Sequence, residues 1–262
     1  MAELEFFDCN CAIGRYTDPP VPDLPATVDE LLETFDYAGI RSALVYHLVA
    51  REYDAETGND ILMEELNGNG RLLPQWVLLP HHTGEFPPPD ELTQTMIDQD
   101  VLTGRIYPSQ KMDLPETGHN FPLADWSAGP LLSALEDRRM PLFVDQSQIT
   151  WNEVHDVCSR HPNLPLVLNQ SARISWRTNR PIWPLWEIHE NLYLDTAENH
   201  ESGYIERIVE RFGPGRLLFG TGLPRWAPGP AIVAISRARI DDDAKRQIAS
   251  GNLKRLLEGV RR

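Results

Sequence analysis

The residues with catalytic potential in this sequence stand at the ends of apolar runs. The run "EFFDCNCAIG" places Asp8 and Asn10 after two phenylalanines, and "SALVYH" ends in His47. Carboxylates and imidazoles transfer protons, and amides donate hydrogen bonds to a developing oxyanion. Polar groups also close the later apolar runs, namely Arg105 and Tyr107, Asp145 and Gln146, Asn169 and Gln170, and Asp195 and Thr196. This recurrence predicts that the ends of several strands together form one polar site.

Proton transfer and carboxylate binding each have candidates among these residues. His47 is the candidate general base, because an imidazole titrates near neutral pH; a histidine hydrogen-bonded within a loop is the alternative. Asp8 and Asp195 are the further candidates for acid–base catalysis. Arg105 could bind a substrate carboxylate through two parallel hydrogen bonds, or form a buried ion pair with Asp8 or another acid of the interior.

Alternation along the first strand predicts which of its side chains share a face. Successive side chains of a strand point to opposite sides, so Asp8 is expected on the same face as Asn10. Cys9 and Cys11 are then expected to point toward the covering helices. With Cys158, the chain has three cysteines, an odd and small number that predicts no disulfide framework and favours buried structural cysteines.

The same rule applied to "LFVDQ" places Gln146 inward and Asp145 outward, where Asp145 would cap the following helix. Trp176 belongs to an aromatic segment, "SARISWRTNRPIWPLW", that would suit an apolar or aromatic small molecule. Packing within the loop or a subunit interface, and hence a homo-oligomer, is the open alternative for this segment. The residues expected to bind substrate are Asn10, Arg105, Tyr107, Gln146, Gln170 and Trp176.

The elements that must position these residues alternate along the chain. Eight strand-like runs are expected at residues 4–10, 42–47, 75–80, 104–108, 142–146, 165–170, 191–196 and 216–222, with helix-like runs between them. Thr27 with Glu30, and Thr150 with Glu153, have the spacing of capping boxes, and Gly39 is expected to end the first helix. Eight strand–helix units in 262 residues predict a single (β/α)8 TIM barrel of class α/β over residues 1–262. A doubly wound open sheet is the competing fold.

Composition narrows the range of partners. The formal net charge is −15, which argues against binding to nucleic acid or to an anionic membrane surface. No apolar run is long enough to cross a membrane, and "MAELEFFD" lacks the basic and apolar regions of a secretion signal. We therefore expect a cytoplasmic protein whose partner is a small molecule.

Several motifs, in order, resemble those of the amidohydrolase-related TIM-barrel hydrolases. The segment "FFDCNCAIG" resembles their first strand, which reads Asp-x-His-x-His, and "GPGRLLFGTGLP" resembles their eighth, which reads Phe-Gly-Ser-Asp-x-Pro. The fifth, sixth and seventh strands are matched by "PLFVDQ", "HPNLPLVLNQSAR" and "NLYLDTAE", and the final helix by "IASGNLKRLL". The resemblance extends over nearly the whole chain.

This resemblance implies a hydrolase whose divalent metal activates water and polarises a carbonyl. The positions of the family's ligands and acid fall on Asn10, Ala12, Gln146, Gln170 and Gly222. Amides are weak neutral ligands for zinc-type metals, and alanine and glycine offer no ligand, so we expect no metal and no other cofactor. The expected function is hydrolysis of a small carboxylated or cyclic carbonyl compound without metal. The alternatives are a catalytically silent relative that binds a small molecule or a protein, and a lyase.

Overall fold

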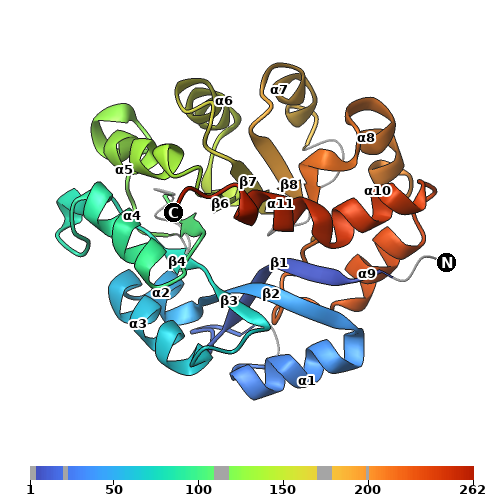
Figure 1. Ribbon diagram of the computed structural model, residues 1–262, viewed down its shortest axis with the longest axis horizontal. Coiled ribbons are helices and arrows are strands. Elements are labelled where there is room, and N and C mark those ends of the chain that lie inside the picture. The colour runs from blue at the N-terminus through green and yellow to red at the C-terminus, as the bar shows by residue number, and fades with distance from the viewer. Residues whose placement is uncertain (1–3, 20–22, 109–117, 170–178, 199–200) are drawn as a thin grey trace.

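Short parallel strands form the inner wall of the molecule, and helices cover them from outside (Figure 1). The computed structural model describes residues 4–19, 23–108, 118–169, 179–198 and 201–262. The strands within these ranges are β1 (Phe6–Ile13), β2 (Ile40–His47), β3 (Leu72–Pro74), β4 (Trp76–Val77), β5 (Gly104–Ile106), β6 (Leu142–Asp145), β7 (Leu166–Asn169), β8 (Leu192–Asp195) and β9 (Leu217–Leu218).

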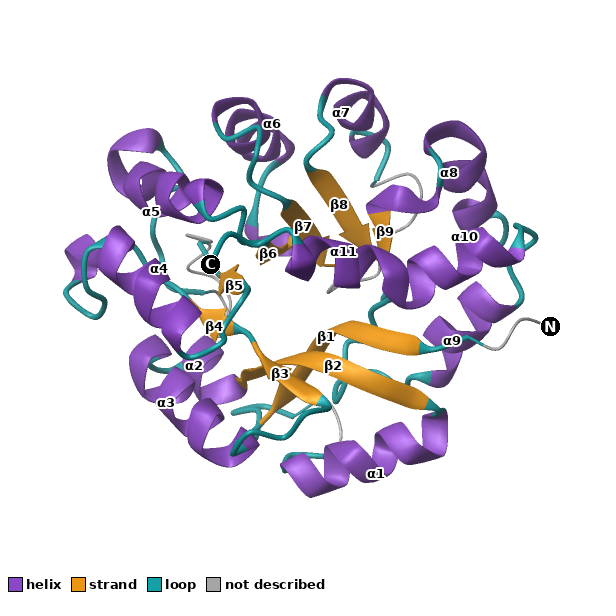
Figure 2. Ribbon diagram, in the orientation of Figure 1, coloured by secondary structure: helices purple, strands orange, loops and turns teal. Residues whose placement is uncertain are grey.

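The helices follow the strands in alternation, as Figure 2 shows. They are α1 (Val28–Ala38), α2 (Leu48–Glu52), α3 (Ala55–Leu66), α4 (Pro89–Asp98), α5 (Asp125–Asp137), α6 (Trp151–Arg160), α7 (Ile182–Ile188), α8 (Tyr204–Phe212), α9 (Gly229–Ser236), α10 (Asp242–Arg246) and α11 (Asn252–Glu258). Short turns of helix are η1 (His81–Thr83), η2 (Gln146–Gln148), η3 (Pro214–Arg216) and the π-helical η4 (Gln247–Gly251). No helix of the described residues is long and apolar enough to span a membrane.

The strands close into a barrel although their pairing is interrupted once. The order is β1-β2-β3 in one sheet and β4 to β9 in the other, all parallel. Gln75 separates β3 from β4, but its backbone amide donates to Val45 at 2.8 Å, so both pieces form the third barrel strand. Cys11 pairs with Leu223, which joins the first strand to the chain beyond β9. The predicted (β/α)8 TIM barrel is confirmed, with a third strand that starts at Leu72 rather than at Gln75.

Capping residues fix the helix ends where the sequence predicts them. Thr27 accepts from the backbone amide of Glu30, and the Glu30 carboxylate reaches back to the amide of Thr27. Thr150 and Glu153 form the same capping box at the start of α6. Gly39 ends α1 in the left-handed region, at φ 76°, where a side chain would be strained.

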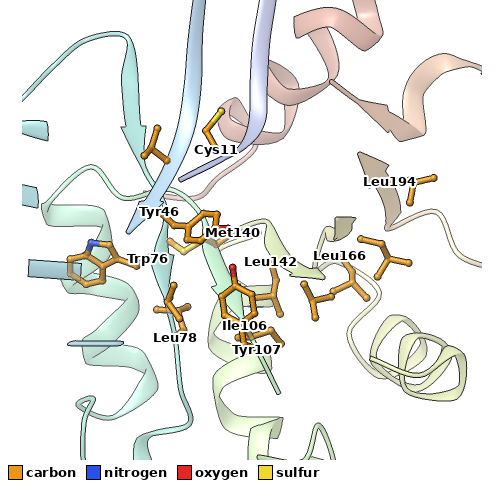
Figure 3. Close-up of a cluster of buried hydrophobic side chains, with 14 of the residues drawn as sticks. Cys11, Tyr46, Trp76, Leu78, Ile106, Tyr107, Met140, Leu142, Leu166 and Leu194 are labelled. Carbon is orange, nitrogen blue, oxygen red and sulfur yellow. The ribbon is translucent and has the colours of Figure 1, made fainter. Parts of the chain in front are cut away.

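Two apolar layers stabilise the barrel, one inside it and one between strands and helices. The inner layer includes Phe7, Cys9, Leu44, Phe143, Val167 and Leu218, together with Leu253, Leu256 and Leu257 of α11. Because Asn252 of α11 donates to the carbonyl of Leu217, this helix closes the end where the strands begin. In the outer layer, Leu142, Leu166 and Leu194 come from three neighbouring strands (Figure 3). The open end is therefore the one where the strands terminate, which we call the mouth.

Candidate active site

Strand register brings polar side chains of distant segments together at the mouth. Arg105 of β5 pairs with Phe143 of β6, which pairs in turn with Val167 of β7, so the three lie at one level inside the barrel. Two residues farther along, alternation returns to the inner face at Tyr107, Asp145, Asn169 and, on β8, Asp195. All four are buried.

Arg105 is the centre of this polar group. Its Nε donates to Gln75 Oε1 at 2.7 Å, and its Nη1 donates to Asp145 Oδ1 at 3.1 Å and to the Tyr107 hydroxyl at 3.3 Å. Its Nη2 donates to Asn10 Oδ1 at 3.0 Å. Every nitrogen of the guanidinium is thereby bonded to protein, and the residue is 0% exposed.

Aromatic rings enclose the same guanidinium. The carbon of the Arg105 guanidinium lies 4.3 Å from the centroid of the Tyr46 ring and 5.9 Å from that of Phe143. Burial alone would lower the pKa of Arg105, but Tyr107, Tyr46 and Asp145 outweigh it and hold the pKa above its ordinary value. Arg105 is a permanent buried cation.

Asn10 links this cation to a second carboxylate. Its Nδ2 donates to Asp195 Oδ2 at 2.8 Å, while its Oδ1 accepts from Arg105. Asn169 Nδ2 donates to the same Asp195 oxygen at 2.8 Å. Asp195 is therefore a buried acceptor held by two amides, and not a carboxylate that faces the solvent.

A cavity of about 30 Å³ lies above this network. It is lined by Asn10, Tyr16, Tyr46, Arg51, Asp145, Gly222, Arg225 and Trp226. The cavity thus combines a carboxylate, two guanidinium groups and aromatic walls.

Arg51 also lines this cavity, and none of the acids that the structure describes is hydrogen-bonded to it. Its guanidinium carbon lies 5.3 Å from the centroid of the Tyr107 ring. No described residue accepts a hydrogen bond from its side chain or forms an ion pair with it. Burial disfavours its charge, but Tyr46, Tyr107 and Asp145 hold the pKa of Arg51 well above its ordinary value. A charged guanidinium to which no described acid is hydrogen-bonded is suited to bind an anion.

Asp8 does not share a face with Asn10, so that prediction is wrong. The pairing of β1 with β2 shifts register between Asp8 and Cys11, and such a bulge reverses the alternation. Asp8 Oδ1 accepts from the backbone amides of Asn10 at 2.9 Å and Thr221 at 3.0 Å, and the Thr221 hydroxyl donates to Oδ2. Burial raises the pKa of Asp8 to about 6, although these hydrogen bonds oppose the rise. Through its hydrogen bonds with Thr221, Asp8 connects β1 to the end of the eighth barrel strand.

The prediction for Cys9 is also wrong, because of the same bulge. Its side chain packs inside the barrel with Phe7 and Val167 instead of pointing toward the helices. Cys9, Cys11 and Cys158 are all buried and free, as predicted.

The orientations predicted for Asp145 and Gln146 are also wrong. Asp145 faces the interior, where it pairs with Arg105, and it caps no helix with its side chain. Gln146 begins η2, is half-buried and does not line the cavity. Phe143 faces the barrel interior, so alternation also turns Asp145 inward; the prediction had assigned the opposite phase to this strand.

His47 lies away from the cavity. Its Nδ1 accepts from the backbone amide of Val49 at 3.1 Å, which caps α2, and its Nε2 lies 3.7 Å from Glu65 Oε2. Burial lowers the pKa of His47. The structure thus shows the hydrogen-bonded histidine that the sequence left as the alternative.

Other predicted site residues fall into two groups. Asn10 and Tyr107 are at the mouth as expected, and Arg105 is there but bonded to Asp145, the second of its two predicted roles. Gln170 and Trp176 lie outside the described residues.

Sequence reasoning missed three contributors to the mouth. Tyr46 could have been found, because alternation makes either His47 or its neighbour face inward. Gln75 also carried a signal, since a polar residue in a buried strand needs a partner. Arg51 carried none, because nothing in "LVARE" distinguishes a helical arginine that reaches the mouth from one that faces solvent.

Comparison with known proteins identifies the class. The chain matches the amidohydrolase family over residues 9–258, and it belongs to that family. No match was found among curated protein sequences.

Solved structures of similar fold cover nearly the whole chain. One is 5-carboxyvanillate decarboxylase from Sphingomonas paucimobilis, with TM-score 0.73, 17% identity, and coverage of 98% of this chain and 99% of that chain. Another is 2,6-dihydroxybenzoate decarboxylase from Rhizobium, with TM-score 0.72, 16% identity, and coverage of 98% and 99%. A third is a probable 2-pyrone-4,6-dicarboxylic acid hydrolase from Acinetobacter baumannii with citric acid bound, with TM-score 0.67, 12% identity, and coverage of 97% and 100%. At these identities the likeness establishes the fold alone.

The metal that the resemblance implies does not fit the described residues. Asn10 has its amide oxygen bonded to Arg105 and its nitrogen to Asp195, while Ala12 and Gly222 offer no side-chain ligand. Among the residues that the structure describes, no group of three or more histidine, cysteine, aspartate or glutamate side chains could hold a metal ion.

Proposed function

We propose that the mouth binds a small carboxylated or cyclic carbonyl compound, an amide or a lactone, and hydrolyses it without a bound metal. The observation that carries this proposal is the juxtaposition in one cavity of Asp145 and Arg51, a cation to which no acid in the described part of the chain is hydrogen-bonded. The proteins of similar fold are named for aromatic or pyrone carboxylic acids, which supports a substrate that carries a carboxylate.

Substrate binding falls to Arg51 and to the rings around it. A carboxylate on the substrate pairs with the Arg51 guanidinium at the wall of the cavity. Tyr16, Tyr46 and Trp226 provide apolar walls for the body of the substrate. Gln170 and Trp176 remain predicted contacts, as does Gln146.

Asp145 takes the role of general base in this proposal. Its Oδ1 is bonded to Arg105, and no described residue donates to its Oδ2, which leaves one carboxylate oxygen to accept a proton. Water gives a proton to Asp145 as its oxygen bonds to the carbonyl carbon. The carbon–oxygen or carbon–nitrogen bond then breaks, and the proton passes from Asp145 to the leaving group. The products are a carboxylic acid and an alcohol or amine.

Asp145 replaces the three acid–base candidates that the sequence suggested. Asp8 is bonded to Thr221, Asp195 accepts from two amides, and His47 caps a helix. None of these three lines the cavity. Asn10 and Tyr107 then support the site by fixing Arg105.

A second candidate is a catalytically silent relative that binds a small anion. It is favoured by the hydrogen bonding of Arg105, Asn10 and Asp195, which is complete without a ligand. A decarboxylating lyase is the third candidate, because two of the proteins of similar fold are named decarboxylases.

A panel of carboxylated lactones, amides and aromatic acids, assayed with and without chelator, tests the proposal. We expect hydrolysis that chelator leaves unchanged and that Asp145→Asn reduces about a hundredfold or more. Asp156→Asn, an exposed aspartate of α6, is the matched control and should retain full activity. Binding without turnover would favour the silent relative, carbon dioxide release would favour the lyase, and full activity of Asp145→Asn would refute the assigned base.

A further inference from the structure

The contacts of Arg105 gather side chains from four separate segments of the barrel. Gln75 comes from the third strand, Asn10 from β1, Asp145 from β6 and Tyr107 from the end of β5. All are buried, and the distances lie between 2.7 and 3.3 Å. One cation therefore organises the inner face of the mouth, as a metal ion organises its ligands.

The orientation of Asn10 agrees with this role. Its oxygen accepts a hydrogen bond from the Arg105 guanidinium and its nitrogen donates one to Asp195. The amide therefore connects the cation to a second carboxylate by hydrogen bonds. An amide keeps its acceptor oxygen at every pH, whereas an imidazole that took up a proton beside Asp195 would have no acceptor for the Arg105 guanidinium. An asparagine at position 10 is therefore well suited to a neighbouring guanidinium.

The charges buried at the mouth also favour Arg105 as its cation. Arg105 and the two carboxylates that it reaches, Asp145 directly and Asp195 through Asn10, are all shielded from solvent. A divalent cation placed at Asn10 would meet the guanidinium at close range, where little water screens the repulsion. The site can therefore hold either the Arg105 guanidinium or a divalent metal ion, but not both.

We propose that the Arg105 guanidinium occupies the place of the family's divalent cation and holds Asn10 and Asp145 as that cation would hold its ligands. This inference concerns the electrostatics of the mouth and goes beyond the proposed function. It stands whether or not Asp145 acts on a substrate.

The test replaces Arg105 and measures binding of Mn²⁺ to the folded protein. Arg105→Ala leaves space beside the Asp145 carboxylate and the oxygens of Asn10 and Gln75, which are hard ligands that suit Mn²⁺. Arg105→Met is the matched control, because it is neutral but fills the space. The readouts are electron paramagnetic resonance of bound Mn²⁺ and the unfolding temperature as a function of Mn²⁺ concentration.

We expect Arg105→Ala to bind Mn²⁺ at least about tenfold more tightly than the wild type or Arg105→Met, with a matching rise in unfolding temperature. If Arg105→Ala folds only when Mn²⁺ is present, as judged by near-ultraviolet circular dichroism, that dependence also supports the inference. Equal Mn²⁺ binding by the wild type and Arg105→Ala, or an Arg105→Ala variant that Mn²⁺ neither binds nor stabilises, would overturn it.

Discussion

Replacing Asp8 with asparagine removes one buried carboxyl group and keeps its shape. Burial holds the pKa of Asp8 at about 6 in the folded protein, against an ordinary value of 3.8. The unfolded chain therefore loses this proton at lower pH than the folded protein. Stability that is present below pH 4 is lost as the pH rises toward 6, because the folded state must then hold an ionised carboxylate in its interior.

The size of the effect follows from the two pKa values. The difference between 3.8 and about 6 corresponds to about 3 kcal/mol of unfolding free energy. In Asp8→Asn this dependence is absent, and the amide oxygen can still accept from the backbone amides of Asn10 and Thr221. We therefore expect the difference in stability, variant minus wild type, to grow by about 2 kcal/mol between pH 4 and pH 7, because part of the effect is already present at pH 4.

Urea unfolding at a series of pH values, followed by circular dichroism, measures this difference directly. Asp60→Asn, at an exposed position of α3, is the control and should show no such trend. A difference between Asp8→Asn and the wild type that stays constant from pH 4 to pH 7 would refute the claim that Asp8 is a buried carboxyl with a raised pKa.

Two further predictions concern the mouth and its surroundings. Arg51→Met should weaken the binding of benzoate, as a simple aromatic carboxylate, by about tenfold or more in isothermal titration calorimetry, because a charged hydrogen-bond donor is lost; unchanged affinity would show that the carboxylate binds elsewhere. His47→Ala should lower the unfolding free energy by about 1 kcal/mol through loss of the α2 cap, with turnover retained; a large loss of turnover at full stability would return His47 to the catalytic site.

The barrel was predictable because its signals are local. Apolar runs of strand length, the capping boxes at Thr27 and Thr150, and the glycine after α1 each depend on a few neighbouring residues. The break at Gln75 was not predictable, since it depends on how the third strand pairs with both of its neighbours.

The site was harder to predict because it depends on side-chain direction. A bulge of one residue in β1 puts Asp8 and Cys9 on the faces opposite to those predicted from Asn10. No residue in "FFDCNCAIG" indicates that bulge. The network itself joins residues far apart, such as Asn10 and Asp195, which are 185 positions apart in the chain. Polar strand ends indicate where a site lies, but only the register of the folded barrel shows which of them meet.

The metal content of the purified wild-type protein tests the central claim most directly, that Arg105 is the cation of the mouth. The protein would be expressed with added manganese and zinc and analysed by plasma mass spectrometry, with its unfolding temperature measured before and after chelation. We predict far less than one equivalent of any divalent metal and an unfolding temperature that chelation leaves unchanged. One tightly held equivalent, whose removal lowers the unfolding temperature, would contradict the account.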